Sequence, residues 1–393
     1  MTDRMLHKKS YLFSRGLGTL SSSIFTLTII WWFQTETDSS SMVGAMNALF
    51  SLASSLAIVY GPFIDRHPLK NISIGSLAVQ TFMFFLLTIT INNTKYSLSF
   101  ILVFSTIAAI CDEFFIPADR AIIKSTVKSK KELGLINSQI SLVDQSINFL
   151  GVALAGVLLN FMKVLNVMVL ITIISFIGII ILLFAIKDIA NSKRKENRKT
   201  KYLEEILYGY KFIKKDNFLK NYFISSSLYS FVTPSLIVFL PYLAQKMGSS
   251  FYYTVFYICF FVGFIFGALF SGRIVPSINT VGIYWSLSFI PLFLLLFFYT
   301  NGILTAILIF LFGLTSSIQN ISSETLIQVR TKDEFLGRVM TTFKTISSIG
   351  GPIGSLLAGF FLDNGWVWVL IIFSALLVIT GGGLIVRSSK LIN

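Results

Sequence analysis

Apolar runs of about 20 residues recur along the whole chain, and this recurrence is the feature that most restricts its fold. A helix needs roughly 20 apolar residues to cross the hydrocarbon core of a bilayer. The runs predict six membrane-spanning helices on each side of a basic segment. They cover residues 11–34, 42–60, 71–91, 97–118, 134–159 and 165–186, then 220–244, 251–271, 280–299, 302–324, 338–362 and 365–387. We therefore expect an all-α membrane protein with twelve transmembrane helices.

The charge distribution fits a membrane protein better than a nucleic-acid-binding one. Only 13 % of residues are charged and the mean hydropathy is +0.77, whereas about a quarter of residues are charged in soluble domains. When the connectors alternate sides, only Lys95, Lys163 and Lys246 of the 32 lysines and arginines fall outside. Cytoplasmic loops carry such an excess of basic residues. We predict a multi-pass protein with both termini cytoplasmic and no nucleic-acid partner.

The basic segment divides the chain into three parts. Residues 1–189 and 219–393 are each expected to form a six-helix bundle, joined by a cytoplasmic linker over 190–218. Apolar residues recur at helical spacing within 203–213, which predicts an amphipathic helix in contact with membrane lipids. The two halves also repeat, since Gly151 and Leu154-Ala-Gly156 recur as Gly354 and Leu357-Ala-Gly359 with the same spacing. Such a repeat is typical of transporters.

A polar loop between the second and third spans reads Gly61-Pro-Phe-Ile-Asp-Arg-His-Pro-Leu-Lys70. Asp65 and Arg66 can pair with each other, and Asp65 can also meet the positive end of a helix from the other half. We interpret Gly61, Asp65, Arg66 and Lys70 as a cytoplasmic gate. The alternative is a basic loop that sets topology and carries one incidental acid. The equivalent stretch of the second half, residues 267–273, has no acid.

Three carboxylates lie inside predicted spans, namely Asp112, Glu113 and Asp144. Ionisable groups within a span are costly and are functional candidates. Burial raises a carboxyl pKa towards neutrality, as a proton-coupled carrier requires. We expect at least one of the three to couple transport to protons, with Asp144 and Glu113 as the leading candidates. Since adjacent helical positions point about 100° apart, Asp112 and Glu113 cannot both face one cavity, so one can carry the proton while the other pairs with Arg15 or Arg120. The alternative is a static ion pair that neutralises Arg15, which itself lines the cavity or reaches towards headgroups.

The second half offers fewer polar residues within its spans. Gln319, Asn320 and Glu324 lie late in the tenth span, and Lys344 lies in the eleventh. Glu324 is expected to pair with Lys344 or Arg338, with a substrate role as the alternative.

The middle of the predicted eleventh span reads Gly350-Gly351-Pro352-Ile-Gly354. Glycines four apart let helix backbones approach closely. Pro352 could also let this helix bend during transport. Tight packing and bending are compatible interpretations.

Several motifs are missing from the sequence. It has no G-x-x-x-x-G-K-[ST] phosphate loop and no H-E-x-x-H metal motif. Cys111 and Cys259 both lie in apolar runs, without metal-site spacing, and His7 and His67 lie near span ends. We therefore expect no enzyme activity, no metal and no cofactor, with a proton gradient as the energy source.

The Asp65 loop and further motifs resemble the major facilitator superfamily, in particular its macrolide-efflux and enterobactin-exporter branch. The other motifs are Phe115-Ile-Pro-Ala-Asp-Arg-Ala121, Lys131-Glu-Leu-Gly134, Leu240-Pro241 and Leu336-Gly-Arg-Val339. The resemblance implies two pseudo-symmetric six-helix bundles, alternating access and a monomer in the bacterial cell membrane. It also implies export of a small-molecule substrate in exchange for protons. Two features depart from drug antiporters: Ser97 opens the fourth span without their arginine, and Phe149-Leu-Gly151 replaces their glycine-proline motif.

Our leading hypothesis is a proton-driven antiporter that exports amphiphilic drugs or macrolides and so confers multidrug or antibiotic resistance. A dedicated exporter of one metabolite, such as a siderophore, is the alternative within the same class. Only Arg15 and Lys344 could make the cavity basic, which favours neutral or cationic substrates. A non-transporting sensor or lipid-handling protein on the same scaffold is the alternative from a different class.

Overall fold

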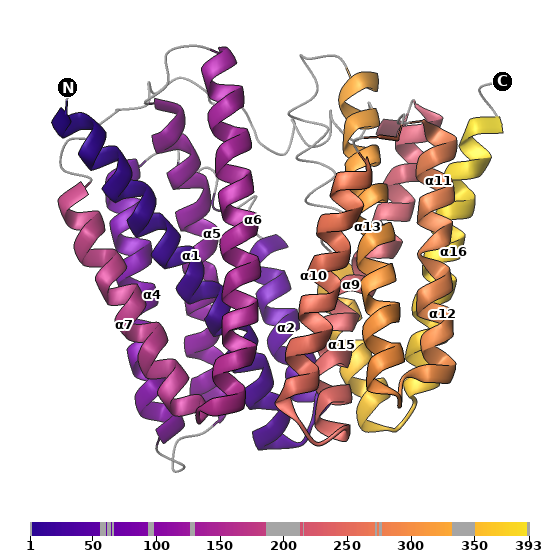
Figure 1. The fold of residues 1–393 in the computed structure, drawn as a ribbon, viewed down its shortest axis with the longest axis horizontal. Coiled ribbons are helices and arrows are strands. Elements are labelled where there is room, and N and C mark those ends of the chain that lie inside the picture. Colours follow the sequence, from indigo (N-terminus) through magenta and orange to yellow (C-terminus); the bar gives the residue numbers. More distant parts are fainter. Residues whose placement is uncertain are drawn as a thin grey trace. The chain divides into compact units, whose positions relative to one another are not determined.

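The computed structural model describes residues 2–55, 60, 64, 67–92, 98–125, 130–185, 213–214, 216–271, 273–274, 277–331 and 350–390, and within them every regular element is a helix (Figure 1). The first-half helices are α1 (Thr2–Thr37), α2 (Ser40–Ser55), α4 (Leu69–Asn92), α5 (Leu98–Ser125), α6 (Lys130–Phe161) and α7 (Val164–Ala185). The second-half helices are α9 (Asn217–Lys246), α10 (Ser250–Ser271), α11 (Ile278–Leu287), α12 (Phe289–Phe298), α13 (Gly302–Arg330), α15 (Gly350–Asp363) and α16 (Val367–Lys390). The all-α prediction is confirmed.

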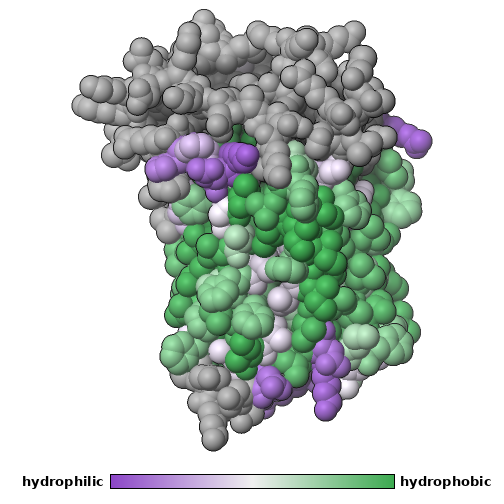
Figure 2. All heavy atoms as spheres, turned by 90° about the vertical axis from the view of Figure 1, so that its left-hand side faces the viewer, coloured by the Kyte–Doolittle hydropathy of each residue, from purple (hydrophilic) through white to green (hydrophobic). Residues whose placement is uncertain are grey.

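Nine described helical stretches are long and apolar enough to cross a membrane. They are Ser10–Thr37, Leu69–Asn92, Leu98–Asp119, Val164–Ala185, Asn217–Lys246, Ser250–Ser271, Ile278–Phe298, Gly302–Ile327 and Val367–Ser388. The other three predicted spans, 42–60, 134–159 and 338–362, correspond to α2, α6 and α15, whose described parts contain shorter apolar stretches. Figure 2 shows apolar side chains forming a broad band, with hydrophilic residues towards its two ends, on the side of unit 1 that carries α7.

The chain divides into two compact units, and the division crosses α1. Unit 1 comprises Met1–Trp32 and Leu56–Asn197, and unit 2 comprises Phe33–Ser55 and Arg198–Asn393. The segment Phe33–Ser55 packs with unit 2, and the predicted bundle boundaries at 189 and 219 stay a prediction. In unit 1, α4 packs against α5 and α7. In unit 2, α15 packs against α2 and α9, and α10 packs against α13.

Two helices differ from the predicted spans, and for the first of them the sequence supplies the reason. The predicted span 280–299 is divided at Ser288 into α11 and α12. Pro291 follows the division, and a proline ring clashes with the carbonyl four residues earlier and removes one backbone donor. α5 continues to Ser125, beyond the predicted end at 118, and keeps Pro117 inside it.

Several predicted features lie outside the described residues. They are the gate residues Gly61, Asp65 and Arg66, the possible partners Arg338 and Lys344, and nearly all of the 190–218 linker with its amphipathic helix. Lys70, the remaining gate residue, lies in the first turn of α4.

Candidate functional site

A buried group of charged side chains lies in unit 1, where α1, α5 and α6 meet. Arg15 on α1 is only 4 % exposed. Its two terminal nitrogens donate to the two carboxylate oxygens of Asp144, at 2.5 and 2.6 Å. Its Nε donates to Oδ2 of Asp119. The Tyr11 hydroxyl donates to the other oxygen of Asp119 at 2.7 Å. We name Tyr11, Arg15, Asp119 and Asp144 the charged cluster.

The cluster corrects one of the two pairings we predicted for Asp112 or Glu113, the one with Arg15; the pairing with Arg120, whose side chain lies outside the described residues, stays a prediction. Asp119 lies seven residues beyond Asp112 on α5, which separates them by roughly 10 Å along the helix. A guanidinium that binds Asp119 is therefore too far along the helix to bind Asp112. The Arg15 guanidinium does not extend to the protein surface in this structure, since Arg15 is 4 % exposed and is bound by both acids.

Two local features bring α6 and α1 together at this place. A Cβ atom added to Gly151 of α6 would lie 2.5 Å from the Cβ of Ser23 on α1, so only glycine fits this close approach. One turn away, Ser23 donates to the side-chain oxygen of Asn148 at 2.6 Å. Asp144 lies two turns before Gly151 on the same helix, which places it against Arg15.

Apolar side chains cover the Tyr11, Arg15 and Asp119 part of the cluster, whereas the Asp144 side chain remains 20 % exposed. Tyr11 belongs to a buried core group that also contains Phe115 and Ala118, which precede Asp119 on α5. In a low-dielectric setting, a bidentate guanidinium–carboxylate pair is strong, and an unpaired member would be costly. The cluster holds two carboxylates and one guanidinium.

Asp112 lies in a different, uncharged setting. Its Oδ1 accepts a hydrogen bond from the hydroxyl of Ser22 on α1 at 3.0 Å. The Gln80 amide on α4 donates to that same hydroxyl at 3.0 Å and to the carbonyl of Ala108 at 3.2 Å. Among the described residues, Asp112 has no cation in ion-pair contact. A carboxylate within a candidate span is therefore held by neutral groups from two other helices.

Glu113 has different neighbours from Asp112, as the angular spacing predicted. It lies close enough to the Tyr60 phenol to interact electrostatically. The Tyr60 ring packs on Phe114, with ring centroids 4.5 Å apart. Glu113 is half-buried.

The polar residues predicted in the second half lie on two faces of α13. Gln319 is buried, and its Oε1 has no hydrogen-bond partner among the described residues. Asn320 and Glu324, one turn apart, are both exposed. Gln319 lies beside Tyr229. The Tyr229 ring packs edge-on against Trp285, with ring centroids 5.4 Å apart, and the Tyr229 hydroxyl contacts the hydroxyl of Ser316 at 2.6 Å. The pairing predicted for Glu324 stays a prediction, because its proposed partners lie outside the described residues.

The glycines that open α15 lie against α9. A Cβ atom on Gly354 would collide with the carbonyl of Phe231, and one on Gly350 would lie 2.9 Å from the carbonyl of Ser227. Gly351 and Pro352 are buried in the same turn. These contacts match the tight-packing interpretation; the predicted bending stays untested.

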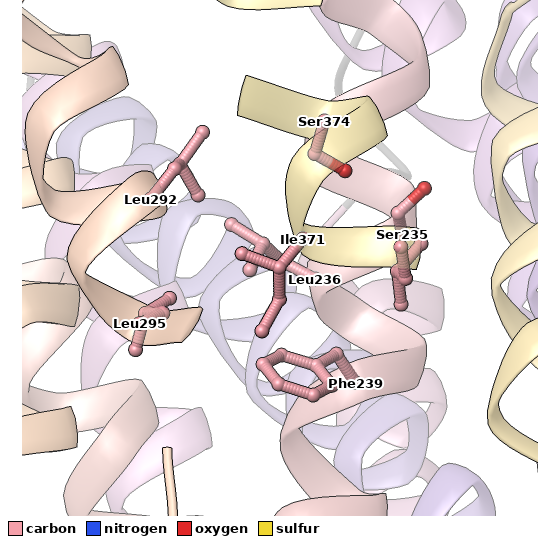
Figure 3. A pocket seen from close by; sticks show the side chains of 8 residues that line it. Ser235, Leu236, Phe239, Leu292, Leu295, Ile371 and Ser374 are labelled. Carbon is pink, nitrogen blue, oxygen red and sulfur yellow. The ribbon is translucent and has the colours of Figure 1, made fainter. Parts of the chain in front are cut away.

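One small cavity in unit 2 is too small for a substrate (Figure 3). Its volume is about 10 Å³, enough for roughly one water molecule. Its lining consists of Ser235, Leu236, Phe239, Leu292, Leu295, Leu370, Ile371 and Ser374. The Ser235 hydroxyl already donates to the carbonyls of Phe231 and Gly354. We interpret the cavity as a packing gap between α9, α12 and α16.

The sequence reasoning missed several members of these groups. Tyr11 and Arg15 are four apart on α1, a spacing that places both on one helix face. Gln80 is a polar residue in the middle of a span, and this position could have identified it as a candidate site residue. Asp119 was noted only as part of a motif, and nothing in the sequence identifies its pairing with Arg15.

Comparison with known proteins supports the fold that the sequence predicted. A family model described as Major Facilitator Superfamily matches residues 11–289. The solved structure of the nucleoside transporter NupG is 15 % identical with a TM-score of 0.73, over 97 % of this chain and 99 % of that one. A bacterial homologue of the human lysosomal transporter Spinster, inward-facing and occupied, is 12 % identical with a TM-score of 0.71, over 98 % and 96 %. No curated protein matches. These likenesses show the major facilitator fold.

Proposed function

The chain belongs to the Major Facilitator Superfamily, and we propose that this transporter exports small amphiphilic molecules from a bacterial cytoplasm in exchange for protons. The family makes it a multi-pass membrane transporter. Direction, coupling ion and substrate are our inference from the residues of its two units.

The observation that supports proton coupling is the difference between the partners of Asp112 and those of Asp144. Asp144 is bound through both oxygens by Arg15, so protonating it would break an ion pair. Asp112 has a hydroxyl and an amide as its neighbours, so a proton can bind it without breaking one. We therefore assign the exchangeable proton to Asp112. Asp144 and Arg15 instead hold α6 against α1.

The pairing of Arg15 with two carboxylates supports a neutral or cationic substrate. An acidic substrate such as a siderophore would need a free cation in the spans. Arg15 is saturated by two carboxylates, and within the described parts of the candidate spans no other arginine or lysine lies far from a span end. The aromatic group around Tyr229 and Trp285, together with exposed Asn320 and Glu324, suits neutral or cationic molecules with aromatic rings. This favours drugs and macrolides over siderophores.

The test is dye efflux from cells that express the protein. Ethidium-loaded cells should lose dye faster than vector controls, and an uncoupler that collapses the proton gradient should abolish the difference. Efflux that persists with the uncoupler would contradict proton coupling. If the well-expressed protein moves no ethidium, a panel of macrolides, nucleosides and siderophores in proteoliposomes follows. Nucleosides are included because a solved relative is a nucleoside transporter. Absence of any gradient across that panel would favour a sensor or lipid-handling protein.

A further inference from the structure

A chain of hydrogen bonds joins Gln80, Ser22 and Asp112 across three helices of unit 1. The Gln80 side chain on α4 is buried, with 2 % exposed. Its nitrogen lies 3.2 Å from the carbonyl oxygen of Ala108 on α5 and 3.0 Å from the hydroxyl oxygen of Ser22 on α1. The Ser22 hydroxyl lies 3.0 Å from Oδ1 of Asp112. Ala108 precedes Asp112 by one turn, so both lie on one face of α5.

The Ala108 carbonyl determines which end of the Gln80 amide faces the chain. A backbone carbonyl only accepts hydrogen bonds, so it must face the amide nitrogen of Gln80 and not the amide oxygen. The same nitrogen carries a second hydrogen, which reaches Ser22. The Ser22 oxygen therefore accepts from Gln80, and its single hydroxyl proton remains for Asp112. Each hydrogen bond between Gln80 and Asp112 then points towards the carboxylate.

Close packing of α1 against α4 supports this geometry. Gly18 lies one turn before Ser22 on α1, and Leu77 lies three residues before Gln80 on α4. A Cβ atom on Gly18 would lie only 3.3 Å from Cδ1 of Leu77. The two helices therefore approach closely beside the chain, and this approach keeps the Gln80 amide within reach of the Ser22 hydroxyl.

The direction of the chain distinguishes the two carboxylate oxygens of Asp112. Oδ1 faces a hydroxyl that is already a donor, so a proton on Oδ1 would meet the proton of Ser22. Ser22 would have to turn its hydroxyl proton away while Gln80 still donates to the hydroxyl oxygen. A proton on Oδ2 leaves the chain intact, because Oδ1 then remains the carbonyl oxygen that accepts from Ser22.

We propose that Gln80 is a positioning residue for the proton site, which holds the Ser22 hydroxyl as a donor to Oδ1 of Asp112 and so directs the exchangeable proton to Oδ2. The proton is exchanged with water, and the O–H bond at Oδ2 is the only bond that forms and breaks on the protein. Gln80 itself keeps its protons throughout. This inference rests on the proposed function, since it takes Asp112 as the residue that carries the proton.

The test records the infrared absorption of the protonated Asp112 carboxyl in the purified full-length protein, reconstituted in lipid. Difference spectra between low and high pH contain the C=O stretching band of each carboxyl that takes up a proton. The Asp112 band is the one that is missing in Asp112→Asn. A C=O stretching frequency rises when the carbonyl oxygen loses a hydrogen bond, so the band reports which oxygen Ser22 contacts.

Ser22→Ala should shift the Asp112 band to higher frequency, because the carbonyl oxygen Oδ1 loses its donor. If the proton were on Oδ1, the carbonyl oxygen would be Oδ2, and the same variant would leave the band in place. Gln80→Leu should give a smaller shift in the same direction although the Ser22 hydroxyl is still present, because nothing then holds the hydroxyl proton towards Oδ1.

Thr81→Ala is the matched control for Gln80→Leu. Thr81 is the next residue on α4, and its buried hydroxyl pairs with Ser175 on α7. The variant loses a buried hydrogen bond of the same helix and should leave the Asp112 band in place. If Gln80→Leu does not fold, Gln80→Asn replaces it. Its amide is one methylene shorter and cannot reach both acceptors, so it should also shift the band upwards.

The outcomes separate this inference from the proposed function. An unshifted band in the Gln80 variant that folds overturns the positioning role, as does an equal shift in Thr81→Ala. An unshifted band in Ser22→Ala overturns the assignment of the proton to Oδ2. If Asp112→Asn removes no band, Asp112 takes up no proton, and the proposed coupling falls together with this inference. The spectra need no substrate, so a failed dye-efflux test leaves a shifted band standing.

Discussion

Arg15 binds both oxygens of Asp144 with its two terminal nitrogens, at 2.5 and 2.6 Å, while its Nε binds Asp119. One cation thus ties α1 to α5 and to α6 in a buried setting. Removing one partner from such a group leaves an uncompensated charge, which costs more than the intact pair contributes. The stability of unit 1 should therefore depend strongly on this arginine.

Arg15→Ala should destabilise the protein by about 3 kcal/mol or more, because it leaves the buried Asp119 and the part-buried Asp144 without a cation. Thermal unfolding in detergent, followed by tryptophan fluorescence, measures the change. Arg15→Lys should recover only part of the loss, since an ammonium cannot bind Asp144 through two parallel hydrogen bonds. An Arg15→Ala protein that unfolds at the wild-type temperature would contradict the charged cluster.

Gly151→Ala should destabilise by about 1–3 kcal/mol, the usual cost of overpacking. Its new methyl group would lie 2.5 Å from the Ser23 Cβ and force α6 away from α1. Gly75→Ala is the control, since nothing lies within 4 Å of its Cβ position; it should be neutral or slightly stabilising. The same unfolding measurement compares the two, and equal effects would argue against the close approach of α6.

Ser22→Ala should slow proton-coupled transport by about tenfold or more. The hydroxyl that contacts both Asp112 and Gln80 is lost, and a hydrogen bond to a charged group contributes about 1.5–3 kcal/mol. Thr26→Ala is the control, one turn along α1, where the exposed hydroxyl donates only to the carbonyl of Ser22. Initial efflux rates at matched expression give the comparison. Equal initial efflux rates in Ser22→Ala and Thr26→Ala would contradict a role for the Ser22 hydroxyl in proton-coupled transport.

Asp363 should stabilise the protein at neutral pH, and this contribution should be lost in acid. Its partial burial alone would raise its pKa, but the hydrogen bonds from Ser41, Ser39 and Ser40 outweigh this and lower the pKa below the ordinary value. The contribution is therefore complete above the ordinary aspartate pKa of about 3.9 and disappears as the pH falls through the lowered pKa. Tyr242 and Asp38 also lie at this end of unit 2.

The difference in unfolding temperature between wild type and Asp363→Asn measures this contribution. It should be constant from pH 7 to about 5 and shrink towards zero below about 4. A difference that grows as the pH falls would have the wrong sign for a carboxylate stabilised by these hydrogen bonds.

The spans were predictable because bilayer thickness sets their length and each span satisfies its own backbone hydrogen bonds. The candidate carboxylates Asp112, Glu113 and Asp144 could be selected because a charge in a span is costly. The division at Ser288 was also within reach, since Pro291 signals it.

Which side chains pair with each other across helices was not predictable from the sequence. Arg15 lies 104 residues from Asp119 and 129 from Asp144, and which of several acids it binds depends on how closely the helices pack. Gly151 fixes that approach, but a glycine in a span does not reveal which helix it faces. The hydrogen bond from the Ser40 backbone on α2 to Asp363 on α15 spans 323 positions, where each end alone is an ordinary helix terminus.

The most direct test of the proposed function is proton movement by the purified protein in liposomes that contain a pH-sensitive dye. Adding a transported substrate should drive protons across the membrane in wild type. Asp112→Asn should fold and bind substrate but move no protons, whereas Asp144→Asn, which leaves Arg15 paired with Asp119, should lose stability and keep some proton movement. Normal proton movement by Asp112→Asn would contradict the assignment of the exchangeable proton to Asp112.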